Sequence, residues 1–165
     1  MSFIEEMQLE KKDDKFFQIY ENKDYVVILS GKGELNSAIA TTYLSKVYEI
    51  QDCDVVVNFG TCASKTTKIG ELIEFGQVVS ISTNQKFILS KNKEKLFCSS
   101  KEILNTNHKY EFVDMESAGF YVSSKKFFKN IKIIKVVSDN FSTYDEALLK
   151  NLKINWEEIC TITKL

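Results

Sequence analysis

Arginine and proline are absent from this chain of 165 residues, so all of its basic side chains apart from one histidine are lysines. Arginine is the side chain best suited to grip phosphate or carboxylate with two parallel hydrogen bonds. A site that holds free phosphate in this protein therefore has to use lysines, hydroxyl groups or backbone N–H groups.

Features of metal sites and membrane segments are also scarce. The four cysteines form no CxxC pair, and His108 is the only histidine. This pattern predicts no zinc site and fits thiols in a reducing compartment. No apolar run reaches the ~18 residues of a membrane span, and the net charge of −1 does not favour nucleic acid. With no signal-peptide pattern at the N-terminus, we expect a cytoplasmic protein that needs no metal or cofactor and binds neither nucleic acid nor membrane.

The length suits a single domain over residues 1–165. Continuous apolar runs predict strands that are buried on both faces, and the remaining segments predict hairpins and helices between them. The expected β segments are a hairpin over 15–31 with "VVIL" as its buried strand, a strand over 52–64 that ends at Gly60, β structure over 69–82, a lysine-rich hairpin over 85–100, and a strand over 131–139. Strands that alternate with helices predict an α/β layer fold with a mainly parallel or mixed sheet.

Helices are expected in four places. One follows Gly33, and its residues Leu35, Ala38, Ile39, Thr42 and Val47 mark one helical stripe. The others are a short piece from Lys101, a helix from Met115 to Phe128, and a helix in the C-terminal tail, where Thr143 and Glu146 have the spacing of a capping box.

Three expected strands end in polar residues, in the segments "VVVNFGTCAS", "FVDMES" and "IIKVVSDN". Ligands of α/β folds collect at the carboxyl ends of strands, so these ends would line one crevice if the strands are parallel. The hydroxyls of Thr61 and Ser64 could cradle an anion or satisfy nearby backbone. Glu116 suits either the first turn of a helix or a ligand hydroxyl, and Asp139 suits either a helix cap or a general acid. Asp114 is expected to be a helix cap.

Taken together, "SGKGELNSAIATTYL", "VVVNFGTCAS…KIGELI" and "FVDMESAGFYVSSKKF…IKIIKVVSDN" resemble the nucleoside phosphorylase and nucleosidase superfamily, in particular its 5′-methylthioadenosine/S-adenosylhomocysteine nucleosidases. The resemblance spans residues 26–140. It implies a three-layer α/β/α fold with a central mixed sheet, and cleavage of the N-ribosidic bond of a purine nucleoside. It also implies a homodimer.

The resemblance assigns roles residue by residue. Glu116 would bind the ribose hydroxyls with Met115 packed beside the sugar, and Asp139, which follows Ser138, would protonate or hydrogen-bond the purine. Thr61 would lie near the attacking group or the ribose, and Gly60 and Ser138 are expected to be substrate-binding residues as well. Apolar contacts to the base would come from Ile103 and Leu104.

The chain also departs from the family pattern. The segment "MSFIEEMQLEKK" resembles the region just after the family's first strand, so that strand and its catalytic glutamate are expected to be absent. Loss of a central strand would expose sheet edges. Four readings follow: a nucleosidase that uses water, a phosphorylase that uses phosphate, a non-catalytic relative that binds nucleosides, or a structural or interaction domain that only keeps the fold. The lack of arginine favours water over phosphate.

Overall fold

The computed structural model describes residues 3–142 and 156–163. Its helices are α1 (Phe3–Glu6), α2 (Glu34–Val47), α3 (Ser117–Ser124) and α5 (Trp156–Thr163). Its strands are β1 (Glu10–Lys12), β2 (Gln18–Glu21), β3 (Val26–Leu29), β4 (Val55–Ser64), β5 (Leu72–Ser80), β6 (Lys86–Ile88), β7 (Glu94–Cys98), β8 (Phe112–Asp114) and β9 (Asn130–Asp139). The predicted cap at Thr143 and the first part of the predicted tail helix lie outside the described residues.

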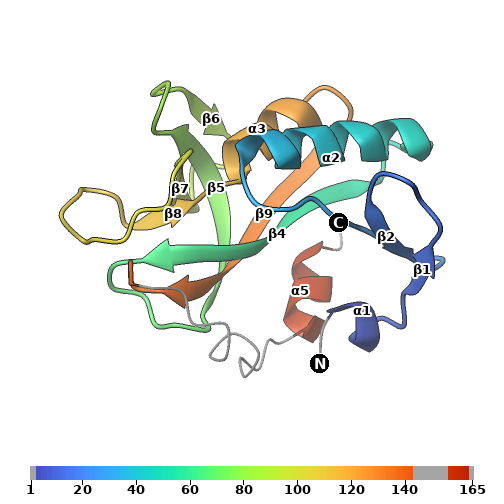
Figure 1. The fold of residues 1–165 in the computed structure, drawn as a ribbon, viewed down its shortest axis with the longest axis horizontal. Coiled ribbons are helices and arrows are strands. Elements are labelled where there is room, and N and C mark those ends of the chain that lie inside the picture. Colours follow the sequence, from blue (N-terminus) through green and yellow to red (C-terminus); the bar gives the residue numbers. More distant parts are fainter. Residues whose placement is uncertain (1–2, 143–155, 164–165) are drawn as a thin grey trace.

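A six-stranded mixed sheet forms the centre of the structure, in the order β6-β5-β7-β8-β4-β9. Strands β4 and β9 are parallel, as are β5, β7 and β8, whereas β8 runs antiparallel to β4. The first half of β5 also pairs with β9, so the sheet curls until five of its strands close on themselves. Helices α2 and α3 lie together on one side and α5 on the other (Figure 1). The predicted α/β fold with a central mixed sheet is confirmed.

The core fills the space between this curled sheet and α3. Its fully buried side chains come from β4, β5, β7, β9 and α3, and include Phe75, Val78, Leu96, Ala118 and Ile133. Burial of such side chains contributes roughly 1.5–3 kcal/mol each relative to exposure. The apolar runs that predicted strands β4 and β9 therefore supply the core against which the polar residues at the strand ends are held.

The hairpin predicted over 15–31 is present as β2 and β3, but its strand "VVIL" is not buried on both faces. Val26 is 37 % exposed and Leu29 is 45 % exposed. The reason is that β3 pairs only with β2, in a separate three-stranded sheet with the order β1-β2-β3. An apolar run cannot distinguish a central strand from a strand at the edge of a small sheet.

Three other local predictions were wrong. Strands β6 and β7 form no hairpin with each other, because both pair with β5 from opposite sides. No helix begins at Lys101, where the chain forms a loop. Strand β4 continues beyond Gly60 to Ser64, because β9 pairs with it as far as Ala63. This extension carries Thr61 on a strand rather than on a turn.

Helix α2 packs with its small residues inward, not with the predicted stripe. Ser37, Ala40 and Thr41 are its buried residues, whereas Leu35 and Ile39 are 78 % and 58 % exposed. The cause is a close approach of α3, since a Cβ on Gly119 would lie 2.0 Å from the carbonyl oxygen of Glu34. The apolar stripe of α2 is thus left on the surface.

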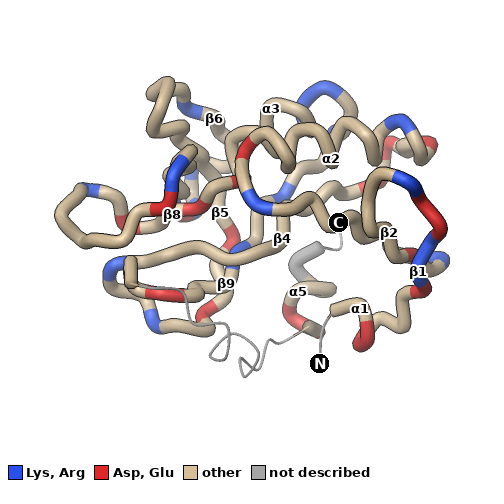
Figure 2. The backbone as a smooth tube through the Cα atoms, in the orientation of Figure 1, with Lys and Arg blue, Asp and Glu red and all other residues tan. Residues whose placement is uncertain are grey.

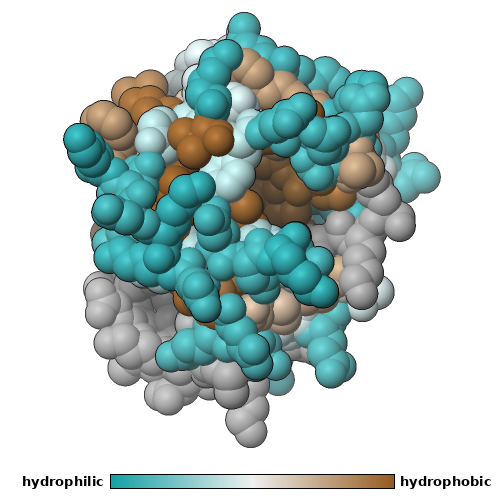
Figure 3. All heavy atoms as spheres, turned by 90° about the vertical axis from the view of Figure 1, so that its right-hand side faces the viewer, coloured by the Kyte–Doolittle hydropathy of each residue, from teal (hydrophilic) through white to brown (hydrophobic). Residues whose placement is uncertain are grey.

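Charged residues of both signs alternate along the backbone tube (Figure 2). The side of the molecule that carries β1 and β2 is mostly hydrophilic, with separate brown patches and one brown hollow (Figure 3). Among the described residues, no helix is both long and apolar enough to cross a membrane.

Candidate functional site

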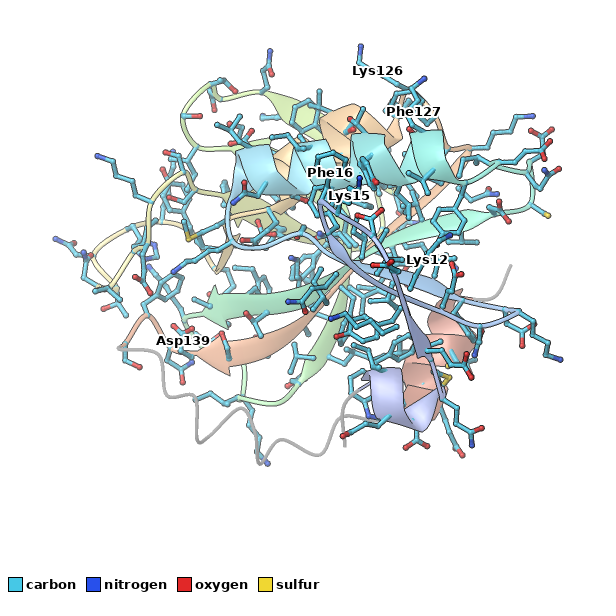
Figure 4. The ribbon with its side chains drawn as sticks, turned by 45° about the vertical axis from the view of Figure 1, so that its right-hand side comes forward. Lys12, Lys15, Phe16, Lys126, Phe127 and Asp139 are labelled. Atoms are coloured by element: carbon cyan, nitrogen blue, oxygen red, sulfur yellow. The ribbon has the colours of Figure 1, made fainter. Side chains whose placement is uncertain are left out.

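A cavity of ≈ 490 Å³ lies along β4, between the ends of β3, β8 and β9. All eight residues for which the sequence predicted a role line it, and these are Gly60, Thr61, Ile103, Leu104, Met115, Glu116, Ser138 and Asp139. Asp139 stands at the carboxyl end of β9, far from the three-stranded sheet that carries Lys12 (Figure 4). The structure therefore gathers these residues in one place, and their roles remain predictions.

The direction of β8 explains how Glu116 reaches the interior of the cavity. Val113 pairs with Ala63, and β8 runs antiparallel to β4, so the residues that follow proceed back along β4. Glu116 thereby arrives beside Lys135, which lies opposite Gly60 in the β4–β9 ladder. Asp139 lies opposite Ala63. Gly60 and Ala63 are three residues apart, which corresponds to ~10 Å along a strand. The two predicted catalytic carboxylates thus lie at different levels of one cavity.

Glu116 is held from two sides. Its Oε1 accepts a hydrogen bond of 2.8 Å from the backbone N–H of Gly33. Its Oε2 lies 3.8 Å from the ammonium of Lys135. Gly33 has φ +104°, a conformation that side chains with a Cβ rarely adopt, so the glycine allows its N–H to point at the carboxylate. The glycine-rich turn before α2 therefore binds a protein carboxylate, and Glu116 keeps a fixed position in the cavity wall.

Lys135 is the least expected residue of the cavity, because its side chain is only 1 % exposed in the middle of β9. Its ammonium lies 3.0 Å from Oδ2 of Asp114, whose side chain is fully buried. Burial alone would lower the pKa of Lys135, but the attraction of Asp114 and Glu116 outweighs it and raises the pKa above the ordinary value of 10.5. Lys135 is therefore a permanent buried cation at physiological pH.

Asp114 does cap α3, as predicted, and also pairs with this cation. Its Oδ2 accepts the backbone N–H of Ser117 at 2.9 Å, and its Oδ1 accepts the Ser117 hydroxyl at 2.6 Å. One carboxylate thus fixes the start of α3 and the ammonium of Lys135 together. Glu116 lies between Asp114 and Ser117 in the chain, so the packing of α3 also fixes the position of Glu116.

Asp139 is oriented by its own chain. Its Oδ1 accepts the backbone N–H of Phe141 at 2.9 Å, and its Oδ2 accepts the hydroxyl of Ser138 at 2.8 Å. Phe141 has φ +58° and is buried against the cavity, so the chain turns sharply after β9. The nearby thiol of Cys62 stays protonated, because burial raises its pKa to about 12. Asp139 therefore presents a carboxyl group in a fixed orientation at this end of the cavity.

The mouth of the cavity is formed by two loops. Ile103 is half-buried and Leu104 is 56 % exposed, so the predicted apolar wall is open to solvent on one side. Lys32 of the glycine-rich turn and Glu102 of the facing loop form an exposed ion pair at 3.8 Å. By contrast, the hydroxyl of Ser64 lies outside the cavity, where it donates to the carboxylate of Glu111 and accepts the N–H of Thr67. This agrees with the alternative in which Ser64 satisfies nearby backbone rather than a bound anion.

One edge of β4 lacks a strand. Within the described residues, β4 pairs with β9 over its length and with β8 only at Ala63 and Ser64. Six consecutive residues of β4, from Asn58 to Ala63, line the cavity, so the cavity runs along this edge.

Among the lining residues that sequence reasoning did not single out are Asn58, Lys135 and Phe141. A signal existed for Lys135, because a lysine interrupts the apolar run "IIKVV" and a charge inside a buried strand needs partners. No comparable signal marks Phe141. Residues 3–142 and 156–163 contain no cluster of three side chains suited to hold a metal ion.

Comparison with known proteins gives the same picture at the level of structure. No protein-family model and no curated protein sequence matches the chain. Among solved structures, one similar protein is 5′-methylthioadenosine/S-adenosylhomocysteine nucleosidase from Colwellia psychrerythraea in complex with adenine. The two structures have a TM-score of 0.68 and 15 % sequence identity, and the match covers 87 % of this chain and 78 % of the nucleosidase chain.

Two Helicobacter pylori proteins are similar to the same degree. A mutant 5′-methylthioadenosine/S-adenosylhomocysteine nucleosidase with 5′-methylthioadenosine in its active site has a TM-score of 0.69 and 16 % identity, over 86 % of this chain and 80 % of its own. Futalosine hydrolase has a TM-score of 0.66 and 16 % identity, over 90 % and 83 %. The resemblance seen in the motifs is therefore confirmed for the fold: this chain has the fold of the 5′-methylthioadenosine/S-adenosylhomocysteine nucleosidases.

Proposed function

We propose that this protein cleaves the N-ribosidic bond of a purine nucleoside and uses water as the attacking group. The observation that carries the proposal is the placement of Glu116 and Asp139 on one cavity, ~10 Å apart along the strands, with the ammonium of Lys135 beside Glu116. This spacing suits a ribose at Glu116 and a purine at Asp139. The ligands of the similar proteins, adenine and 5′-methylthioadenosine, support an adenosine-like substrate.

The chemistry gives each group a task. When the bond between sugar and base breaks, positive charge develops on the ribose and negative charge on the purine. The carboxylate of Glu116 stabilises the positive sugar and accepts hydrogen bonds from its hydroxyls. Asp139 donates a proton or a hydrogen bond to the departing purine. Met115 and Thr61 would pack against the ribose, and Ile103 and Leu104 against the base.

The charges of the cavity support water over phosphate. The one buried ammonium of the described residues, that of Lys135, is already paired with two carboxylates, Asp114 and Glu116. A phosphate dianion would enter a region of net negative charge, whereas water pays no such penalty. Lys32 is paired with Glu102 and lies at the exposed mouth.

A second candidate is a protein that binds nucleosides without cleaving them. The unpaired edge of β4 favours it, because that edge is where a central strand with a further carboxylate would be expected. Either candidate suits a cytoplasmic protein of nucleoside metabolism.

An assay of base release separates these candidates. The purified chain is incubated with 5′-methylthioadenosine or adenosine, with and without phosphate, and free adenine and the sugar product are measured. We expect adenine and free sugar without phosphate. Release that requires phosphate and yields a sugar phosphate would make it a phosphorylase. Binding of the nucleoside in calorimetry without release would make it a binding protein, and neither binding nor release would refute the proposal.

We also propose that two copies associate through the exposed stripe of α2. Leu35 and Ile39 are exposed on α2. Phe16, which is 75 % exposed, contacts the ring of Tyr43 on the same helix. Phe16 lies beside α2 (Figure 4). Exposed apolar patches of this kind mark interaction surfaces.

Sedimentation of variants tests this association. Ile39→Lys places a charge in the stripe and is expected to convert dimers into monomers without lowering the unfolding temperature, because Ile39 is exposed. Ile88→Lys is the matched control, since Ile88 is 55 % exposed on β6. A monomeric wild-type chain at micromolar concentration, or a dimeric Ile39→Lys variant, would speak against the interface.

A further inference from the structure

Asn58 is a buried polar residue whose side-chain oxygen no described residue of the protein binds. It lies in β4, is 9 % exposed and lines the cavity. Within the part of the chain that the structure describes, its side-chain oxygen, Oδ1, has no hydrogen-bond partner. Buried amide oxygens in folded proteins are almost always paired, because an unpaired one destabilises the folded state. An unpaired amide beside a cavity therefore points to a partner that a ligand or a bound water supplies.

The position of Asn58 indicates what that partner is. Asn58 and Gly60 share one face of β4, since side chains alternate along a strand. Gly60 has no side chain, and a Cβ placed there would lie 3.4 Å from the Lys135 ammonium. No β4 side chain thus separates the amide from the ammonium. The two strand positions are ~6.6 Å apart. The Asn58 side chain spans part of that distance, so one water with hydrogen bonds of about 2.8 Å to each group can join the amide and the ammonium.

We infer that Asn58 positions the attacking water of the reaction proposed above, together with Lys135 and Glu116. The water accepts a hydrogen bond from the Lys135 ammonium and donates its two hydrogens to Oδ1 of Asn58 and to the carboxylate of Glu116. One lone pair stays free for the sugar. The amide reaches this water by turning about its Cβ–Cγ bond, a torsion with broad preferences.

The reaction step balances. The free lone pair of the water forms the new C–O bond at the anomeric carbon of the sugar. The C–N bond breaks at the same time, and the electron pair of that bond leaves with the purine. The water proton that faces Glu116 passes to that carboxylate. The purine takes a proton from Asp139. This inference rests on the proposed function and adds Asn58 to it as a positioning residue.

Two substitutions separate a positioning role from a structural one. Asn58→Leu keeps the approximate size and removes the acceptor, whereas Asn58→Asp keeps an acceptor. For Asn58→Leu we expect kcat to fall about tenfold or more with little change in KM, and the unfolding temperature without ligand to equal or exceed that of the wild type. Asn58→Asp is expected to retain most of kcat.

Competition with methanol gives a readout that a structural role would not move. Methanol has one O–H group and cannot donate to Asn58 and Glu116 at once, so the wild type should favour water. In Asn58→Leu this preference is expected to weaken, and the fraction of methyl riboside among the products should rise. Asn130→Leu is the matched control, because its amide is paired with the carbonyl oxygens of Asp52 and Asp54. It should lower the unfolding temperature and leave the product ratio unchanged.

The outcomes distinguish this inference from the proposed function. A wild-type chain that releases no adenine refutes the proposed function, and with it the role of the water. A wild-type chain that cleaves, with an Asn58→Leu variant of unchanged kcat and product ratio, refutes the role of Asn58 alone. A large drop in the unfolding temperature of Asn58→Leu would also overturn it, since the amide would then be a structural hydrogen-bonding group.

Discussion

Replacement of Lys135 by methionine is expected to destabilise the protein by about 3–5 kcal/mol. The substitution keeps an unbranched side chain of similar length and removes the charge. It leaves Asp114, whose side chain is fully buried, without its cation at 3.0 Å, and Glu116 without its partner at 3.8 Å. An uncompensated buried carboxylate costs far more than the ion pair contributes. Urea denaturation of the two proteins measures the difference.

Two further variants control this experiment. Lys129→Met breaks the exposed ion pair with Asp52 and should cost less than about 1 kcal/mol. The double change Lys135→Met with Asp114→Asn should recover part of the lost stability, because the buried negative charge is removed as well. Equal losses for Lys135→Met and Lys129→Met would contradict the account of Lys135 as a buried counter-ion.

The pH dependence of stability provides a separate check on the same residue. Because the folded protein raises the pKa of Lys135, the ion pair contributes its full stability below the ordinary value of 10.5. That contribution is lost as the pH rises through the higher folded value. The wild-type denaturation midpoint should therefore fall more steeply at strongly alkaline pH than that of Lys135→Met.

Asp139→Asn is expected to lower the rate of base release by a factor of about 10²–10⁴. Asparagine keeps an oxygen for the N–H of Phe141, so the turn after β9 should persist. It cannot deliver the proton that the departing purine needs. Steady-state release of adenine measures the loss, and circular dichroism verifies that the fold is retained.

The matched control is Asp54→Asn. Asp54 also accepts a backbone N–H, that of Gln51, but it does not line the cavity. The same chemical change there should leave the rate unaltered. A rate for Asp139→Asn within a factor of a few of the wild type would exclude Asp139 as the acid.

Local pattern was sufficient for most of the elements that carry the cavity. The apolar runs of β4 and β9 predicted strands, because a mostly apolar segment of that length has to be buried. The residues at the strand ends were candidates because ligands of α/β folds collect there. The family resemblance assigned roles to Met115, Glu116 and Asp139, which do lie on one cavity. Asp114 was correctly expected to cap α3, since a short acidic side chain before a helix accepts its first N–H groups.

Local sequence patterns could not predict which distant segments pair with or cover one another. A hairpin over 85–100 was the simplest reading of two short strands, yet β5 inserts between them. The stripe of α2 read as a buried face, but Gly119 lets α3 approach its small residues instead. Each error concerns which surface another segment covers, and nothing within the segment itself carries that information.

For this protein, the order and chemistry of the motifs are properties of the sequence: acids follow two apolar strands, and no arginine is available to bind phosphate. The state of Lys135 belongs to the tertiary structure. Only the antiparallel course of β8 along β4 places Asp114 and Glu116 around its ammonium and leaves Asn58 unpaired nearby. The physical reason is that burial and charge neutralisation depend on neighbours that are distant in the chain, whereas strand and helix periodicity depends on neighbours a few residues away.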